Sequence, residues 1–395
     1  MSRILSRPRL RDGIFSVGVL VLLISLILFP QQSVAAAKDG VDLCLNVIMP
    51  SLFPFFVLST LCVELGLIQG LGNLLQRLMY PLFRVNGACS GAFLLGIVGG
   101  YPVGARTAIE LYQKGQCSKS EAERLLSFCN NSGPAFILGV VGAGIFSSSI
   151  AGLWLYGAHV AASVLVGLLF RFYGEHDHTM FRPLRTKTPQ AVGFAEAFTD
   201  AVKNAFWGTL NICGFVIFFT VLIRLLFLTG IITLLASGIA WLLQGFGIQQ
   251  AWAESILSGI IEMTSGVWSL RDVAGTLGNR LCMAAFILGW AGLSVHCQVL
   301  SFIGSSGLST RTYFFGKLLH GIFSAGIIYA ISSLLGWNTP VAEYLASQVT
   351  VIAELDFHRA LVVSTATALI VWLILTIISL VMMAKDYGNR EKNNV

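Results

Sequence analysis

The sequence has few charged residues, and this scarcity decides its broad class. Charged side chains make up 11% of the 395 residues, whereas 55% of the residues are hydrophobic. A soluble domain carries about 25% charged residues, and the mean hydropathy of +0.79 agrees with a membrane location. The apolar segments are long rather than short and alternating, which excludes a transmembrane β-barrel. The composition therefore predicts an all-α, polytopic protein of the lipid bilayer.

Other absences exclude whole classes of function. The eight cysteines are scattered and form no C-x-x-C pair, so the sequence predicts neither a disulfide framework nor a metal site. It has no Walker-type loop and no nucleophile–base arrangement, so we expect no ATP-driven pump, no enzyme and no cofactor. The net charge of +6 does not indicate nucleic-acid binding. Most Lys and Arg residues lie between apolar blocks, where they set membrane topology.

Uncharged runs predict about eight transmembrane helices, since roughly 20 apolar residues cross a bilayer. The arginines ahead of the first run place the N-terminus in the cytoplasm. That run is either an uncleaved first helix or a signal peptide, because the small residues Ser33–Ala37 resemble a cleavage site. The expected spans are 13–37, 43–63, 125–146, 150–170, 204–223, 281–304, 318–337 and 360–384.

Two further apolar runs contain residues that a continuous helix disfavours. Residues 85–105 end in G-I-V-G-G-Y-P-V-G, and residues 254–270 contain S-G-I-I-E-M-T-S-G-V. Glycine and proline destabilise helix interiors, and irregular backbone at membrane depth persists only where protein or a watery cavity satisfies it. We therefore predict a re-entrant hairpin in each run. Pro50 and Pro54 in the second span indicate a kink, or else a broken helix that lines a pathway.

The two halves of the chain repeat the same order of segments. Phe93–Val98 aligns with Ile256–Ile261, and Ser132–Pro134 falls near Ala291–Leu293 at a similar separation. We expect an N-terminal transmembrane helix and loop (1–42), a first repeat (43–170) and a cytoplasmic linker (171–203). A second repeat (204–340) and a segment with an outer loop, the last transmembrane helix and a cytoplasmic tail (341–395) follow.

The charge distribution predicts that the two repeats have opposite orientations in the membrane. The positive-inside rule makes the first hairpin open inward and the second open outward. Inverted repeats with broken helices near the midplane are typical of secondary transporters. The scheme requires residues 229–247 to lie shallow rather than to span. It also leaves Arg271 and Arg280 outside, against the rule.

The first half supplies one group of candidate solute-binding residues. Arg106 follows the first hairpin, and its planar fork suits a carboxylate or a phosphate, although an anchor at the membrane interface is the alternative. Tyr101 lies in the hairpin turn. Asn130, Asn131 and Ser132 precede a helix expected to begin at Pro134, where they either bind an anion together with the helix start or only cap it.

The second half supplies the other group. Glu262 lies in the second hairpin beside Thr264 and Ser265, and an intramembrane carboxylate either couples transport to protons or pairs with Arg106. His296 and Gln298 lie inside an uncharged run. His296 is either a proton carrier or a hydrogen-bonded packing residue.

Three motifs resemble the sporulation integral membrane protein YlbJ family, which is built on the nucleoside-recognition or Gate domain. They are I-M-P-S-L-F-P-F-F-V-L-S at 48–59, G-G-Y-P-V-G-A-R at 99–106 and E-A-E-R-L-L-S-F-C-N-N-S-G-P at 121–134. The second half, with G-I-I-E-M-T-S-G at 259–266, resembles a second Gate repeat. The resemblance implies two Gate-like repeats in a membrane protein of endospore-forming bacteria, made in the mother cell.

The resemblance also implies a solute. Its expected role is to move dipicolinic acid, a small aromatic dicarboxylate, across the outer forespore membrane by alternating access. Gate domains are similar to the core of concentrative nucleoside transporters, so a nucleoside or nucleobase transporter is the alternative. A non-transporting sporulation scaffold is a third hypothesis, and homo-oligomerisation stays open.

Overall fold

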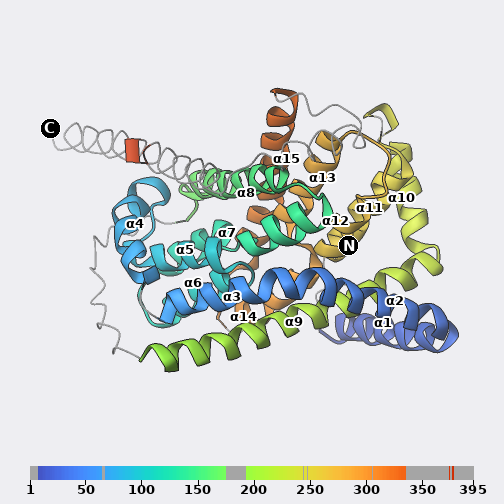
Figure 1. Ribbon diagram of the computed structural model, residues 1–395, viewed down its shortest axis with the longest axis horizontal. Coiled ribbons are helices and arrows are strands. Elements are labelled where there is room, and N and C mark those ends of the chain that lie inside the picture. The colour runs from blue at the N-terminus through green and yellow to red at the C-terminus, as the bar shows by residue number, and fades with distance from the viewer. Residues whose placement is uncertain are drawn as a thin grey trace.

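The described part of the chain is helical throughout its regular elements. In the computed structural model it comprises residues 8–64, 67–174, 193–242, 244–246, 248–304, 306–334, 373, 376 and 377. All elements in these residues are helices (Figure 1), which confirms the all-α prediction. Five of the described helices are long and apolar enough to cross a membrane, or six if one strongly bent pair counts as a span. The expected last span, 360–384, and the acidic loop before it lie outside the described residues, apart from three isolated positions.

The elements fall into two series of the same order. The first half contains α1 (Pro8–Leu28), α2 (Pro30–Leu43), η1 (Cys44–Ile48), α3 (Met49–Glu64), α4 (Leu67–Phe83), η2 (Gly87–Cys89), α5 (Ser90–Gly99), α6 (Val103–Gln113), α7 (Lys119–Phe128), η3 (Ala135–Ile145) and α8 (Ser149–Phe170). The second half contains α9 (Phe194–Leu228), α10 (Ile231–Leu242), η4 (Gln244–Phe246), α11 (Gln250–Ile261), α12 (Met263–Ser269), α13 (Leu277–Trp290), α14 (Gly292–Ile303) and α15 (Thr310–Leu334).

Each series runs from a long apolar helix to a short helix, a hairpin, a broken helix and a second long helix. The hairpins are α5 with α6 and α11 with α12, whose arms pack against each other. The broken helices are α7 with η3, and α13 with α14. This order agrees with the internal repeat that the sequence predicts.

In both halves the tip of the hairpin touches the break of the helix that follows it. Gly100 lies so close to Gly133 that a Cβ atom on Gly100 would be 2.9 Å from the Gly133 nitrogen. A Cβ atom on Gly292 would be 3.0 Å from the Met263 nitrogen. Gly100 and Gly292 also have φ angles of 74° and 77°, which glycine adopts without the steric cost of a side chain. Each hairpin tip is thus in contact with the helix break of its own half, and the two halves make this contact in the same way.

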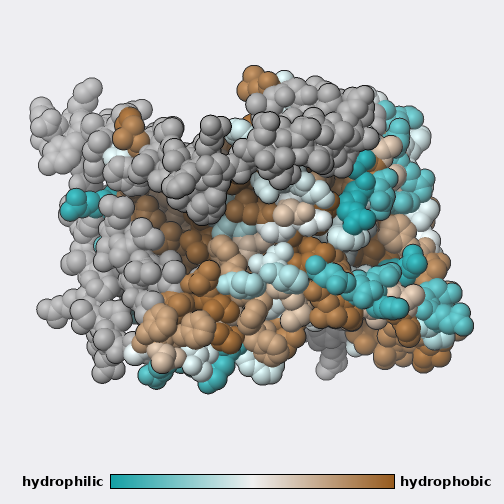
Figure 2. Space-filling model, viewed as in Figure 1, coloured by the Kyte–Doolittle hydropathy of each residue, from teal (hydrophilic) through white to brown (hydrophobic). Residues whose placement is uncertain are grey.

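The outer surface is suited to lipid. Hydrophobic side chains cover much of the face in Figure 2 that is not drawn in grey. The long helix α9 leaves Phe206, Trp207 and Phe218 exposed. Large exposed apolar areas of this kind mark a membrane or partner surface, and together with the apolar spans they identify an integral, multi-pass membrane protein.

Several boundaries differ from the sequence prediction. The helix through Pro50 and Pro54 is continuous from Pro30 to Leu58, so it is not broken and the expected loop before residue 43 is absent. Lys38 and Asp39 are exposed on α2, whereas its opposite face packs small residues against α9. Small residues permit such close helix packing in membranes. Likewise, α9 begins at Phe194, inside the expected linker.

The first hairpin also extends further than expected. Its second arm, α6, continues to Gln113, past the predicted end at residue 105. After the connector, the predicted capping box forms, because the Ser118 and Glu121 side chains each accept a hydrogen bond from the other residue's backbone. The helix α7 therefore begins where the sequence indicated and ends at the break before Pro134.

The segment predicted to lie shallow is too short to cross the bilayer as a helix. The helix α10 has 12 residues, which correspond to about 18 Å, against about 30 Å of hydrocarbon. This length agrees with the inverted arrangement, which itself stays a prediction.

Cysteine labelling tests the inversion. In a variant without the eight native cysteines, we expect Tyr112→Cys and Arg271→Cys to react with a membrane-impermeant maleimide from opposite sides. Opposite reactivity follows because the two hairpins are predicted to open to opposite faces. Labelling of both positions from the same side would exclude the inverted arrangement.

Candidate functional site

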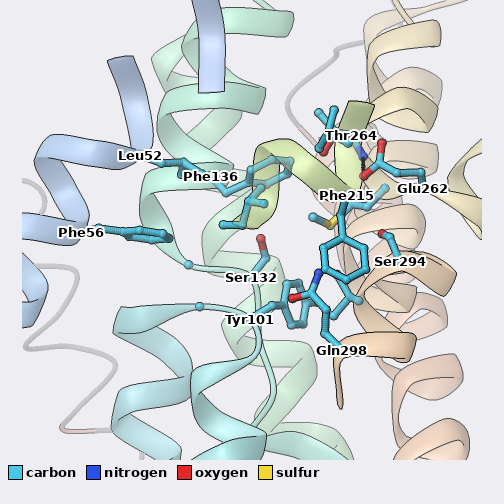
Figure 3. Close-up of a pocket in the computed structure, with 16 residues that line it drawn as sticks. Leu52, Phe56, Tyr101, Ser132, Phe136, Phe215, Glu262, Thr264, Ser294 and Gln298 are labelled. Carbon is cyan, nitrogen blue, oxygen red and sulfur yellow. Dashed lines mark hydrogen bonds between the residues drawn. The ribbon is translucent and has the colours of Figure 1, made fainter. Parts of the chain in front are cut away.

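One pocket lies where the two hairpin tips and the two helix breaks converge. The space between its lining atoms, counted together with the open solvent at its mouth, is about 540 Å³. Each half contributes corresponding parts: the tip residues Gly100 and Tyr101, the break residue Ser132, and their counterparts at 262–264 and 294–298 (Figure 3). The long helices α3 and α9 complete the wall with apolar side chains.

The structure brings half of the predicted site residues into this pocket. Those that line it are Tyr101, Ser132, Glu262, Thr264 and Gln298. Asn130 and Asn131 are buried at the same helix break as Ser132 but do not line the pocket. Ser265 follows Thr264 and its hydroxyl contacts that of Thr220 in α9 at 3.2 Å.

Arg106 does not lie in the pocket. Its side chain is 63% exposed on α6, and its Nε donates to Glu110 Oε1 at 3.0 Å. The structure therefore shows Arg106 neither in the pocket nor paired with Glu262. The reason is that α6 continues through Arg106, so that the acidic residue one turn later is its natural partner.

Glu262 closes the tip of the second hairpin. Its carboxylate accepts hydrogen bonds from the Thr264 nitrogen at 2.9 Å and the Ser265 nitrogen at 2.6 Å. The residue is 2% exposed and separates α11 from α12. A carboxylate that accepts with both oxygens satisfies two amide groups that a helix start leaves without partners. Its position in the pocket wall is thus fixed by backbone bonds.

The break in the first half presents polar groups around Ser132. The Ser132 nitrogen donates to His159 Nε2 at 2.9 Å, while its hydroxyl oxygen is buried without a hydrogen-bond partner. Asn131 donates from its amide nitrogen to the Phe128 carbonyl oxygen at 3.0 Å, and its own amide oxygen has no partner. Unsatisfied buried polar atoms are uncommon, so the hydroxyl facing the pocket is available to a solute.

Behind Tyr101 lies a buried lysine that the sequence analysis did not select. Lys317 is 1% exposed, and its Nζ contacts the Tyr101 hydroxyl at 3.0 Å, the Asn130 carbonyl oxygen at 2.9 Å and His320 Nδ1 at 3.2 Å. No ion pair with a carboxylate is found for it within the described part of the chain. The Tyr101 hydroxyl in turn donates to the Leu288 carbonyl oxygen at 2.8 Å.

Lys317 lies one residue ahead of the expected span 318–337, but α15 begins at Thr310 and carries it into the interior. The available signal was the spacing of Lys317 and His320, which places both on one helix face. A second missed residue, His159 in α8, packs against His320 with ring centroids 4.1 Å apart and the ring planes tilted by 40°.

His296 belongs to a neighbouring cluster rather than to the pocket wall. Its Nδ1 is 2.9 Å from the Tyr313 hydroxyl, and its ring meets Trp290 edge-on with centroids 4.5 Å apart. These contacts match the packing interpretation of this histidine.

Comparison with known proteins is consistent with this architecture. The family described as Gate, nucleoside recognition, matches residues 45–172. The sporulation integral membrane protein YlbJ of Bacillus subtilis (strain 168) is 31% identical over 342 residues, which are 81% of this chain and 83% of that protein.

Solved structures of CNTnw show a more distant likeness. In an inward-facing substrate-bound state, CNTnw is 14% identical, with 85% of this chain and 88% of that chain covered and a TM-score of 0.49. For a CNTnw variant in an outward-facing state, the identity is 14%, the coverage 82% and 88%, and the TM-score 0.48. The sequence relationship over most of both chains is the decisive finding. The chain belongs to the sporulation integral membrane protein YlbJ family.

Proposed function

We propose that this protein is a secondary transporter that moves a small organic anion by alternating access, with dipicolinic acid as the expected solute. The observation that carries the proposal is the pocket enclosed by two hairpin tips and two helix breaks, one of each from each repeat. Secondary transporters bind their solutes between repeats at interrupted helices of this kind.

The chemistry of the pocket suits a flat ring with polar substituents. Phe56, Phe136 and Phe215 line it together with Tyr101, and aromatic faces pack well on aromatic solutes. The free Ser132 hydroxyl offers a donor, and the starts of η3 and α14 favour negative charge. Among the described residues, Lys317 provides a fully buried amine that lies behind Tyr101.

Membership of a sporulation protein family supports a role in spore formation. We therefore expect the protein in the outer forespore membrane, across which the family resemblance implies that the solute moves. A fluorescent fusion in a sporulating host tests this location: a signal confined to the mother-cell plasma membrane would exclude it.

The nucleoside alternative is favoured by one finding, the match of residues 45–172 to a nucleoside-recognition family. A nucleoside also has a flat ring and hydroxyl groups. Glu262 and Gln298 in the pocket wall offer oxygen atoms that can accept hydrogen bonds from the hydroxyl groups of a nucleoside. A dicarboxylate has no such donors and would face the negative charge of Glu262.

Flux into proteoliposomes separates these hypotheses. Full-length protein is reconstituted, and uptake of labelled dipicolinate is compared with uptake of labelled uridine and with empty liposomes. We expect uptake of labelled dipicolinate. Unlabelled dipicolinate should inhibit this uptake, whereas unlabelled uridine should not. Uptake of uridine alone would establish the alternative, and no uptake of either solute would favour a scaffold.

Arg106→Ala is expected to leave dipicolinate flux close to that of the wild type. The side chain is exposed and bound to Glu110, and exposed ion pairs contribute about 1 kcal/mol or less. The measurement is initial uptake normalised to reconstituted protein. A flux as low as that of empty liposomes would place Arg106 on the solute path after all.

A further inference from the structure

We propose that Lys317 and His320 form a proton-binding site that couples the solute site to protons. This inference rests on the proposed transport function and identifies its coupling ion. It is carried by three observations: an amine buried in the protein interior, three acceptors arranged around it, and no carboxylate bound to it within the described residues.

The three acceptors match the three hydrogens of a lysine ammonium group. They come from separate elements: Tyr101 from the tip of the first hairpin, the Asn130 carbonyl from the end of α7, and His320 from α15 itself. The carbonyl lies where the helix dipole is negative. Within the described residues, a protonated Lys317 is therefore stabilised by dipoles only, and its charge has no fixed counter-ion there.

The hydrogen bonds of His320 define where its proton lies. Its Nε2 is 2.9 Å from the His159 carbonyl oxygen, which only accepts, so Nε2 carries the hydrogen. Its Nδ1 is then free to accept from Lys317 Nζ. If the proton moves from Nζ to Nδ1, an amine and an imidazolium result, and the imidazolium donates from both nitrogens. One proton thus has two positions within a single hydrogen bond.

The surrounding titratable groups do not neutralise this charge. Tyr101 faces the cluster from the hairpin, Cys129 from α7, His159 from α8, Tyr313 from α15 and His296 from α14. None of them carries a negative charge at neutral pH in its ordinary state. Glu262 lies across the pocket, where its carboxylate is held by two backbone amides.

A solute anion would supply the missing counter-charge. Tyr101 lies between Lys317 and the pocket, since it both lines the pocket and accepts from Nζ. An anion in the pocket favours the protonated cluster, and by linkage the protonated cluster favours the anion. Each anion would then bind together with a proton, and a pH gradient would drive solute accumulation.

Calorimetry on the full-length protein in detergent tests this linkage. Dipicolinate is titrated at a pH at which it is fully ionised, in buffers with different ionisation enthalpies, so that the heat reports proton uptake. We expect the wild type to take up as much as about one proton per bound solute. At pH values above the one at which the Lys317–His320 cluster loses its proton, the affinity for dipicolinate should fall by as much as about tenfold per pH unit.

Two substitutions at Lys317 distinguish a proton site from a structural charge. Lys317→Arg keeps a cation that does not titrate, so we expect binding without proton uptake and without pH dependence over about pH 6–9. Lys317→Met removes the charge and is expected to abolish proton uptake and to weaken binding. The matched control is Lys114→Met, because Lys114 is 65% exposed beside Glu110; it should behave as the wild type.

The wild-type measurement stands even if the Lys317 variants do not fold. In that case His320→Gln, which keeps an acceptor for Nζ, is expected to shift the pH of half-maximal proton uptake; an unchanged midpoint would overturn the role of His320. Solute binding by the wild type without proton uptake would overturn the inference alone. A wild type that neither binds nor transports dipicolinate would overturn the proposed function and the inference with it.

Discussion

Gly96→Ala is expected to destabilise the protein and to abolish solute flux. Gly96 and Gly104 lie on the two arms of the first hairpin and both face the carbonyl group of Cys129 at the end of α7. A Cβ atom on Gly96 would overlap the Cys129 carbonyl oxygen and lie 2.8 Å from its carbon. Overpacking a core costs about 1–3 kcal/mol where side chains can move. Here the obstacle is backbone, so we expect the upper end of this range.

The matched control is Gly91→Ala in the same helix. No atom lies within 4 Å of a Cβ built on Gly91, and alanine is favoured over glycine in a helix by as much as about 1 kcal/mol. We expect this variant to melt at or above the wild-type temperature and to retain flux. Melting in detergent and flux per reconstituted protein are the measurements. Equal melting temperatures for Gly96→Ala and the wild type would show that the hairpin does not pack on α7 as described.

The parts of the site that local backbone chemistry controls were predictable. Glycine and proline around Tyr101 indicate the first hairpin, and the polar run before Pro134 indicates the start of a helix there. Both are present. The alignment of Ser132–Pro134 with Ala291–Leu293 pairs two positions at which the structure interrupts a helix, although the sequence predicts uninterrupted spans over 125–146 and 281–304. Glycines at 133 and 292 allow a close approach to a hairpin tip in both halves.

The placement of charges was not predictable in the same way. The sequence assigns Arg106 either to the cavity or to the membrane interface and places Lys317 just ahead of an expected span; the structure leaves Arg106 exposed on α6 and buries Lys317. Each assignment relied on where an uncharged run ends, whereas the helices α6 and α15 continue beyond those limits. The acceptors of Lys317 include Tyr101 and Asn130, which are about half the chain away in sequence. No local pattern reports such a contact.

Glu262→Ala is expected to reduce flux to the level of empty liposomes and to lower the melting temperature. The substitution leaves the Thr264 and Ser265 amide groups without the acceptor they have at the hairpin tip. Each unsatisfied buried group costs about 1–3 kcal/mol. Glu262 also contacts the second break, since its Cα lies 3.3 Å from a Cβ built on Gly292. Loss of the cap would therefore disorder the tip, the break and one wall of the pocket together.

Glu262→Gln separates capping from proton carriage. The amide side chain has one acceptor oxygen, so it can replace one of the two bonds while its NH₂ group faces the other donor. If Glu262 caps the tip, melting temperature and flux should fall in the order wild type, Glu262→Gln, Glu262→Ala. If instead it carries the coupling proton, both variants should lose accumulation driven by a pH gradient to the same extent, with Glu262→Gln melting like the wild type. The two hydrogen bonds from the Thr264 and Ser265 backbone amides favour the graded result, because protonation would weaken the bonds that hold the hairpin tip.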